Sequence, residues 1–157
     1  MERRSFLKKA GVGLAAGAVA APAIAQSAPT IKWRMASSFP KSLDTLHGSA
    51  EFLVKRIAEM SGGKFQIQLF AAGEIVPGPG VHDAVKDNTV EIGFTCSYYY
   101  FGKDPTHCID TAIPFGMNAR QIKAWYRQGN GAKLIGDFLA KSNIVSFPSG
   151  NTGVQMG

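Results

Sequence analysis

The sequence predicts an α/β fold in which helices cover a largely parallel β-sheet. Two observations support this class. Segments of alternating apolar and polar residues, typical of strands, take turns with segments whose apolar residues recur at helical spacing. Glycine and proline residues, which favour turns, separate many of these segments. The predicted order is strand, helix, strand, helix, strand, a long loop, helix and a final strand.

The first predicted strand is followed by the first predicted helix. Residues 31–36 alternate apolar and charged side chains, and the loop 37–40 follows them. Ser42 lies where a helix N-cap is expected, and apolar residues then recur at helical spacing through residues 43–60. On this helix we expect His47 at the solvent edge rather than as a ligand.

The next two strands flank a short helix. Residues 64–70 show the most regular alternation in the chain, so we predict a strand with one polar face. After a turn-rich segment, residues 81–87 are predicted to form a short helix and residues 90–96 the third strand. Residues 97–117 contain glycine, proline and three successive tyrosines, and we expect a long loop or short turns there.

The last predicted elements are a helix and a strand. Asn118 can cap a helix that runs to about residue 140 and is interrupted near residues 129–131. Residues 144–147 are predicted as a fourth strand. In sheets of this kind, ligands bind beyond the carboxyl ends of the strands. Here these ends are residues 37–40, 71–74, 97–100 and 150–155.

The first residues of the chain resemble an export signal. Arg3 and Arg4 precede Phe-Leu-Lys, residues 10–20 are rich in glycine and alanine, and a small-x-small cleavage site follows at residues 23–25. The paired arginines resemble a twin-arginine signal, which a translocon receptor reads. The apolar run is too short to span a bilayer, which needs about 20 residues. We therefore predict cleavage after Ala25 and a periplasmic mature chain.

Composition and charge narrow the classes of partner. An apolar fraction of 45% and an aromatic fraction of 10% are typical of a globular protein. The formal net charge is +6, but the predicted signal peptide contains four basic residues and one acidic residue, so the rest carries about +3. The basic residues are scattered, whereas nucleic-acid binding needs a dense basic face. We expect no nucleic-acid partner, and the mild positive charge suits an anionic small molecule.

Catalytic and metal-binding motifs are not found in the sequence. His47, His82 and His107 lie on three different predicted elements, without metal-ligand spacing. Cys96 and Cys108 could form a disulfide in an oxidising periplasm or remain buried thiols, and both alternatives stay open. No haem, flavin or iron–sulfur motif is visible, so no cofactor is expected. A twin-arginine-exported periplasmic enzyme remains the alternative function, because that route often serves proteins that fold around a cofactor.

Two segments carry candidate binding residues. Tyr98 and Tyr100, two residues apart, could line a cleft with apolar rings and hydroxyl groups, or two of the three tyrosines could pack in the core. Asn151 and Gln155 lie in a glycine-flanked loop whose amide groups could bind a carboxylate. The amide oxygen of Gln155 is also a candidate ligand for a hard cation.

Four blocks of the sequence resemble the extracytoplasmic solute receptors of TRAP transporters, most closely the branch that binds 2-oxo acids such as pyruvate. The blocks are residues 31–40, 70–78, 97–105 and 150–157. The resemblance implies a class-II-like periplasmic binding protein with two α/β lobes, a cleft between them and hinge strands that cross more than once. It also implies that a small 2-oxo acid or related carboxylate is captured, without any reaction, for a sodium-coupled membrane permease.

The resemblance also assigns roles to residues. In the 2-oxo-acid branch, an arginine holds the ligand carboxylate, and a glutamine holds it together with a bound sodium ion or another cation. Gln155 matches that glutamine, as a ligand of both the substrate and the metal, and Asn151 lies in the same cleft-facing segment. The resemblance leaves a homodimer of the full-length protein open.

Length sets the expected domain boundaries. Members of this family are more than twice as long as the mature chain here, which implies that the sequence covers mainly the first lobe. We expect a signal peptide at residues 1–25, an incomplete first lobe at residues 26–148, and the start of the crossing into a second lobe at residues 149–157. The carboxylate-binding arginine would then lie beyond Gly157, and the isolated fragment 26–157 would fold only loosely.

Overall fold

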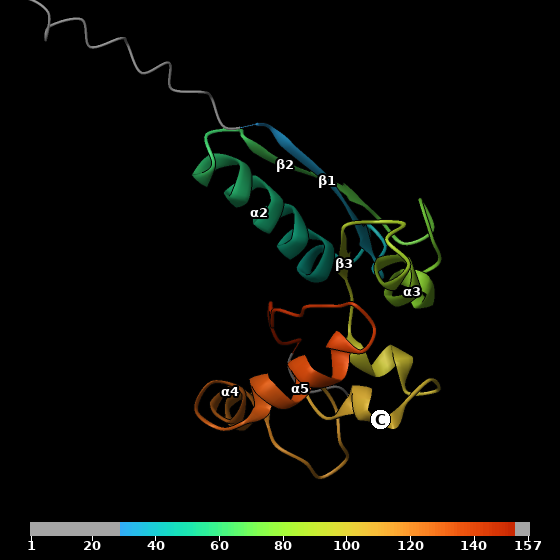
Figure 1. The fold of residues 1–157 in the computed structure, drawn as a ribbon, viewed down its shortest axis with the longest axis vertical. Coiled ribbons are helices and arrows are strands. Elements are labelled where there is room, and N and C mark those ends of the chain that lie inside the picture. The colour runs from blue at the N-terminus through green and yellow to red at the C-terminus, as the bar shows by residue number, and fades with distance from the viewer. Residues whose placement is uncertain (1–28, 153–157) are drawn as a thin grey trace, which may run out of the picture.

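A three-stranded parallel sheet forms the centre of the upper part of the molecule in Figure 1. The structure is a computed structural model and describes residues 29–152. The strands are β1 (Ile31–Ser37), β2 (Phe65–Phe70) and β3 (Ile92–Phe94), in the order β2-β1-β3. The predicted α/β class with a parallel sheet is therefore confirmed, although the third strand is shorter than the predicted residues 90–96.

Strand register places the carboxyl ends of all three strands at one edge of the sheet. Ile31 pairs with Phe65 at the start of β1 and β2, and Met35 pairs with Ile92 where β3 begins. All pairs are parallel, so the loops that leave the three strands emerge on the same side. This is the edge where the sequence predicts a ligand.

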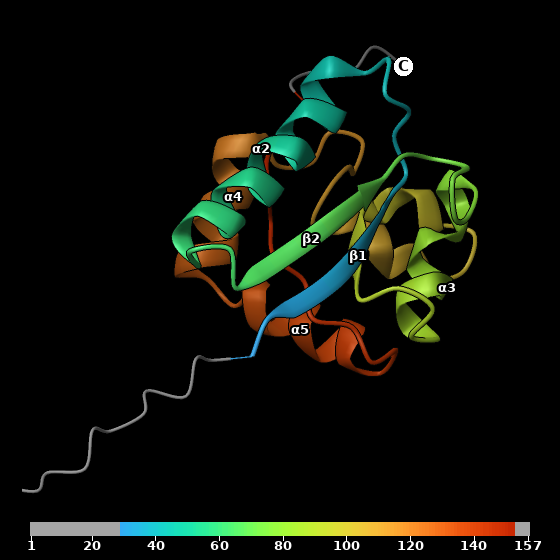
Figure 2. The ribbon, with the colours of Figure 1, turned by 90° about the horizontal axis from the view of Figure 1, so that it is seen from above.

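Helices cover both faces of the sheet. Helix α2 (Asp44–Met60) packs on one face, where Met35, Ala50 and Ile67 form a buried cluster. Helix α3 (Val81–Lys86) packs on the other, where Ala36, Val81, Ala84 and Val90 form a second buried cluster. Met35 and Ala36 are neighbours in β1 and point to opposite faces, so β1 contributes to both cores. Figure 2 shows α2 and α3 on opposite sides of β1.

Helix α2 confirms the predicted helix but corrects two details. Its N-cap is Leu43, without a side-chain hydrogen bond, so the prediction of Ser42 as the N-cap is wrong. His47 is only 5% exposed, so its predicted place at the solvent edge is also wrong. His47, Ala50 and Val54 are spaced by three and four residues, which turns His47 toward the buried side of the helix.

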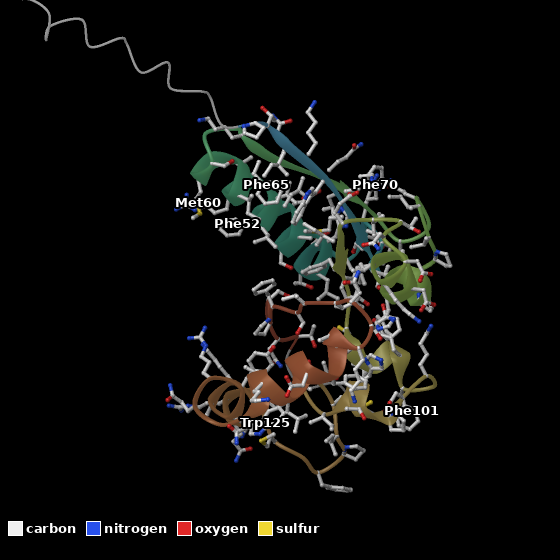
Figure 3. The ribbon with its side chains drawn as sticks, in the orientation of Figure 1. Phe52, Met60, Phe65, Phe70, Phe101 and Trp125 are labelled. Carbon is white, nitrogen blue, oxygen red and sulfur yellow. The ribbon has the colours of Figure 1, made fainter. Side chains whose placement is uncertain are left out.

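The outer side of α2 carries large apolar side chains. Phe52 is 70% exposed and Met60 is 78% exposed. Figure 3 shows both side chains on the side of the helix that faces away from the sheet. The face of α2 that packs on the sheet is therefore not its only apolar surface.

The lower part of the molecule in Figure 1 contains α4 (Ala119–Gln128) and α5 (Gly131–Ala140). These two helices confirm the predicted interrupted helix. A capping box begins α4, in which the Asn118 side chain accepts a hydrogen bond from the Gln121 backbone N–H at 3.0 Å. The tight turn into α5 needs a glycine, because a Cβ on Gly131 would lie 2.7 Å from the Trp125 ring.

The loop predicted at residues 97–117 contains two short 3-10 helices, η2 (Ser97–Tyr100) and η3 (Pro105–Cys108). A third one, η1 (Gly78–Gly80), precedes α3. The prediction of a long loop or short turns is confirmed. The three tyrosines therefore lie on a helical turn rather than at the end of a strand.

The predicted fourth strand is wrong. Residues 144–147 lie among the described residues and have no strand conformation. Val145 is 79% exposed and Phe147 is 84% exposed. Alternation favours a strand only where a neighbouring strand can satisfy the backbone hydrogen bonds, and within residues 29–152 the edge strand β3 pairs with β1 alone.

Within residues 29–152, no helix is long and apolar enough to cross a membrane. The predicted signal peptide at residues 1–25 and the end of the predicted crossing segment lie outside the described residues.

Candidate functional site

A chain of hydroxyl groups ties the loops together at the carboxyl edge of the sheet. The Ser38 hydroxyl oxygen lies 2.8 Å from the Gly78 carbonyl oxygen and 2.6 Å from the Thr95 hydroxyl oxygen. The Thr95 hydroxyl lies 2.7 Å from the Tyr100 hydroxyl, which accepts a hydrogen bond from the His82 backbone N–H at 3.2 Å. The loops after β1 and β3 and the start of α3 are thus joined through side chains.

The Ser38 hydroxyl has a single proton, which it donates either to the Gly78 carbonyl or to the Thr95 hydroxyl. The Tyr100 hydroxyl accepts from the His82 backbone N–H, and either Tyr100 or Thr95 donates in the contact between their hydroxyl groups. Tyr100 is only 2% exposed, so these contacts hold a buried side chain at this edge of the sheet.

The β1 and β2 loops are joined by a second set of contacts. Glu74 accepts a hydrogen bond from the Ala71 backbone N–H at 2.8 Å, and Lys41 donates to its other carboxylate oxygen at 2.6 Å. The Lys41 ammonium and the Ala71 N–H hold the pKa of Glu74 below its usual value. The Ala72 backbone N–H also donates to the Phe39 carbonyl at 3.1 Å. The carboxyl edge is therefore a connected rim rather than a set of independent loops.

The three tyrosines differ in exposure. Tyr100 is buried, Tyr98 is half-buried, and Tyr99 is 42% exposed. The Tyr98 and Tyr99 rings meet edge to face with centroids 4.7 Å apart. Burial of part of the side chain and the Tyr98 hydroxyl raise the pKa of Tyr99 to about 12, so this phenol stays neutral. Of the three tyrosines, Tyr98 and Tyr99 are thus the ones whose side chains are partly exposed to solvent at this rim.

The remaining predicted site residues lie at the end of the described chain. Asn151 is exposed there, and Gln155 lies outside the described residues. The structure therefore brings Tyr100 into the rim and places Tyr98 next to it. The predicted ligand contacts of Tyr98, Tyr100, Asn151 and Gln155 stay predictions.

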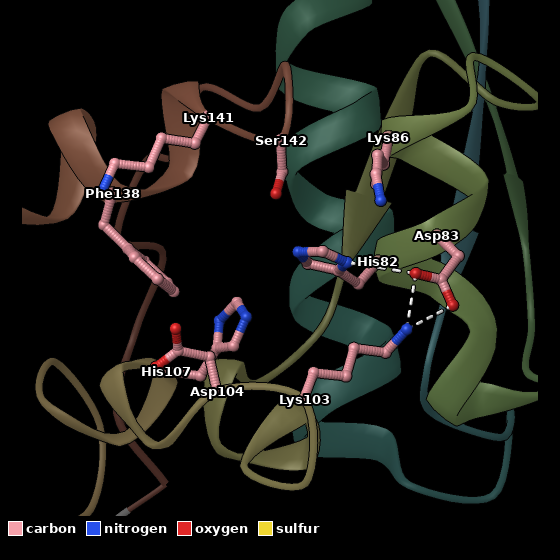
Figure 4. Close-up of a pocket in the computed structure, with 9 residues that line it drawn as sticks. All are labelled: His82, Asp83, Lys86, Lys103, Asp104, His107, Phe138, Lys141 and Ser142. Carbon is pink, nitrogen blue, oxygen red and sulfur yellow. Dashed lines mark hydrogen bonds and ion pairs between the residues drawn. The ribbon is translucent and has the colours of Figure 1, made fainter.

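A pocket that the sequence did not indicate lies between α3, residues 103–107 and the end of α5. Its volume is about 280 Å³. Nine residues line it, as Figure 4 shows: His82, Asp83, Lys86, Lys103, Asp104, His107, Phe138, Lys141 and Ser142. They come from three separate parts of the sequence, and no motif or regular spacing connects them.

Two buried histidines meet at this pocket. The His82 and His107 rings are edge to face with centroids 5.1 Å apart, and His107 meets Phe138 of α5 at 4.8 Å. Burial and the neighbouring His82 lower the pKa of His107. The Lys103 ammonium donates to both carboxylate oxygens of Asp83 and lowers the pKa of that carboxyl. No group of three or more metal-ligating side chains is found within residues 29–152.

Cys96 and Cys108 are free thiols, each half-buried. Of the two alternatives that the sequence left open, the structure therefore has the unpaired one. Burial raises the pKa of the Cys96 thiol, so it is a poor nucleophile. Burial also raises the pKa of Asp110, whose carboxylate lies 3.5 Å from the Ser97 hydroxyl.

Comparison with known proteins identifies the family of this chain. Residues 36–157 match the bacterial extracellular solute-binding proteins of family 7. The chain belongs to this family. The resemblance to the solute receptors of TRAP transporters is thereby confirmed.

Individual relatives include a monocarboxylate 2-oxoacid-binding periplasmic protein of Nostoc sp. (strain PCC 7120). It is 46% identical over 163 residues, which cover 100% of this chain and 44% of the relative. The chain thus spans less than half the length of this curated relative.

Two solved TRAP transporter solute-binding proteins have similar folds. The protein from Bordetella bronchiseptica has a TM-score of 0.72 and 45% identity, over 74% of this chain and 35% of that one. It is a mixed-occupancy dimer with copurified calcium and picolinate in one active site and an apo site. The protein from Pseudoalteromonas atlantica, with bound sodium and pyruvate, has a TM-score of 0.78 and 34% identity, over 82% and 39% of the two chains.

Proposed function

We propose that this chain belongs to the periplasmic receptor of a TRAP transporter that captures a small 2-oxo acid. The observation that carries the proposal is the 46% identity, along the whole chain, to a protein named for binding monocarboxylate 2-oxoacids. The receptor binds the acid without reaction and presents it to a sodium-coupled membrane permease. Closure of two lobes around the ligand is its working step.

The proposed binding residues are Tyr98, Tyr100, Asn151 and Gln155. The half-buried Tyr98 ring, which lies beside the more exposed Tyr99, supports this choice. Tyr100 is buried, and its hydroxyl contacts with His82 and Thr95 hold this segment in position. Gln155 supplies an amide oxygen to a cation that also meets the ligand carboxylate. Support comes from two similar proteins, in which a carboxylate and a cation are bound together.

We further propose the route by which the receptor reaches its ligand. Residues 1–25 act as a twin-arginine signal that is cleaved after Ala25. Residues 26–148 form the first lobe, and residues 149–157 begin the crossing toward the second. The periplasmic name of the Nostoc relative supports this location.

Calorimetric titration of the protein expressed from its own gene tests the function. Pyruvate and longer 2-oxo acids are titrated in sodium buffer and in choline buffer, with lactate as a ligand that lacks the oxo group. We expect saturable binding of a 2-oxo acid that is stronger in sodium than in choline. Absence of binding of every 2-oxo acid would overturn the proposed function.

The Gln155→Ala variant tests the proposed cation ligand. We expect at least a tenfold loss of pyruvate affinity, about 1.4 kcal/mol, with little change in the melting temperature of the unliganded protein. Gln68→Ala, at an exposed position of β2, is the matched control and should bind as the parent does. Equal affinity in Gln155→Ala and the parent would show that the residue has no part in binding.

A further inference from the structure

We propose that the pocket between α3, residues 103–107 and the end of α5 binds a small tetrahedral oxyanion, such as phosphate, sulfate or a phosphate monoester. This pocket differs from the proposed 2-oxo-acid site, and the buried Tyr100 ring packs against His82 and His107 on its wall. None of Tyr98, Tyr100 and Asn151 lines the pocket. The inference does not depend on the proposed function.

The first reason is the balance of charge on the pocket wall. Three lysines line the pocket against two aspartates. Lys103 is paired with Asp83 through both carboxylate oxygens. Within residues 29–152, Lys86 and Lys141 form no salt bridge, so their ammonium groups are available to an anion.

The acidic side chains on the wall are already engaged. Asp83 is satisfied by Lys103, and Asp104 accepts a hydrogen bond from the Thr106 backbone N–H at 2.8 Å. The hydrogen bonds from Thr106 hold the pKa of Asp104 below its usual value. His107 and Lys141 also lower the pKa of Asp104, so this carboxylate offsets part of the Lys141 charge. The three lysines still exceed the two aspartates on the pocket wall.

The second reason is an unsatisfied nitrogen that faces the pocket. The Nε2 atom of His82 is buried and has no hydrogen-bond partner among the described residues. The ring is held in place, because Tyr100 packs against it at 4.8 Å and the Tyr100 hydroxyl accepts from the His82 backbone N–H. Figure 4 shows the His82 ring directed into the space between His107 and Ser142. A buried polar atom without a partner destabilises the fold, and a hydrogen bond to a ligand oxygen would offset that cost.

The chemistry of His82 favours an anion over a neutral ligand. Its other ring nitrogen, Nδ1, lies 3.5 Å from the Asp83 carboxylate, which favours a proton on Nδ1. A charged His82 ring donates from Nε2 toward the pocket, and an oxyanion there accepts that hydrogen bond. The charged and titratable groups that line the pocket around His82 are Asp83, Lys86, Lys103, Asp104, His107 and Lys141.

The size and remaining wall of the pocket fit this ligand class. A volume of about 280 Å³ is several times the roughly 30 Å³ of one water molecule, so it holds a tetrahedral anion and part of its hydration. The Ser142 hydroxyl offers a further donor, and the Phe138 ring provides an apolar wall. A phosphate monoester could place its organic group against that ring.

Titration of the protein expressed from its own gene with sulfate, inorganic phosphate and glycerol phosphate tests the proposal. Calorimetry measures the affinity for each anion. We expect saturable binding of sulfate and of inorganic phosphate. Stronger binding of glycerol phosphate than of inorganic phosphate would identify a monoester as the preferred source of the oxyanion.

The variant Lys86→Gln/Lys141→Gln removes the two available ammonium groups. We expect at least a tenfold loss of sulfate affinity. Lys133→Gln, on an exposed part of α5 and paired with Asp137, is the matched control and should bind as the parent does. His82→Phe keeps an aromatic ring and removes the unpartnered nitrogen, and it should also weaken sulfate binding. If His82→Phe does not fold, the lysine variant alone decides the outcome.

Two results would overturn the proposal. Equal sulfate affinity in the parent and the Lys86→Gln/Lys141→Gln variant would indicate an adventitious ion only. Displacement of sulfate by saturating pyruvate would show that the anion occupies the proposed receptor site. Sulfate binding by a protein that fails to bind any 2-oxo acid would support this pocket while contradicting the proposed function.

Discussion

Residues 31–94 and residues 97–152 are stabilised in different ways. The first region has a sheet whose central strand β1 contributes to a buried cluster on each face. In the second region, the buried apolar side chains among the described residues are Tyr100, Ile135 and Leu139. Ring contacts of His107 with His82, Tyr100 and Phe138 supply much of its packing. Regular backbone pairing holds one region, and contacts between irregular segments hold the other.

The largest expected effect of this difference is on how much the free energy of unfolding falls when a core side chain is shortened. Met35 is 1% exposed and lies in the cluster between β1 and α2. Met35→Ala should lower the free energy of unfolding by about 2–5 kcal/mol, because it leaves a cavity among surrounding apolar side chains. Ile135→Ala, at a 2% exposed position of α5, should fall at the low end of that range, about 2 kcal/mol, because fewer buried apolar neighbours surround it.

Urea denaturation of the two variants measures the difference. Val145→Ala, at a residue that is 79% exposed, is the control and should change the free energy by no more than about 0.5 kcal/mol. If Ile135→Ala lowers the free energy of unfolding by as much as Met35→Ala or more, the second region has a core as tightly packed as that of the sheet.

In the second region, we expect a pH-dependent change of intermediate size in the free energy of unfolding. The folded protein lowers the pKa of His107, so below about pH 6.5 the unfolded chain binds the proton more readily. The stability associated with neutral His107 is therefore present above pH 6.5 and is lost as the pH falls from there toward the folded pKa. The loss from one such group is at most about 1.4 kcal/mol per pH unit.

Comparison with His107→Gln isolates this contribution. The variant has no titrating group at this position, so its stability should fall less between pH 7.5 and pH 5.5 than that of the parent. Urea denaturation at both pH values gives the loss of stability of the parent and that of the variant. Parallel loss of stability in the parent and the variant would contradict a buried neutral His107.

The smallest change in stability is expected for the ion pair between Arg34 and Glu91. Glu91 accepts hydrogen bonds from the Arg34 backbone N–H at 2.7 Å and from the Arg34 guanidinium at 2.9 Å. These contacts lower the pKa of Glu91 to about 2. The Arg34 and Glu91 side chains are 48% and 34% exposed, so solvent screens the pair, and Glu91→Gln should lower the melting temperature at neutral pH by no more than about 3 °C.

Acid titration gives the sign of this contribution. The folded pKa of Glu91 lies below its unfolded value of about 4.5, so the stabilisation is present above pH 4.5 and is lost as the pH falls toward 2. The difference in melting temperature between Glu91→Gln and the parent should therefore shrink over this range. A difference that stays constant down to pH 2.5 would show that the charge of Glu91 contributes nothing.

The same two regions explain what could be predicted from the sequence. Strands β1 and β2 and helix α2 followed from residue alternation and helical spacing, because periodic burial leaves a periodic pattern. Residues 144–147 show the limit of this reasoning. Their alternation is that of a strand, yet within the described residues they have no strand to pair with.

The rim and the pocket show a second limit. The sequence identified the loops at the carboxyl ends of the strands, but not the hydroxyl chain through Ser38, Thr95 and Tyr100, which depends on how three loops meet. His82, His107 and Lys141 are far apart in the sequence, so no spacing could indicate a shared pocket. The binding role of Gln155 came from a resemblance to a family, and its geometry lies outside the described residues.

We infer that the carboxyl edge of this sheet helps to bind a 2-oxo acid. A crystal structure of the protein expressed from its own gene, grown with pyruvate and sodium, would locate the ligand. We expect pyruvate density beside the Tyr98–Tyr100 rim, with the Gln155 amide oxygen bound to a cation that also contacts the carboxylate. Pyruvate density found only in the pocket of His82, Lys86 and Lys141 would contradict this binding role. Pyruvate density found only at a place remote from both the rim and that pocket would contradict it as well.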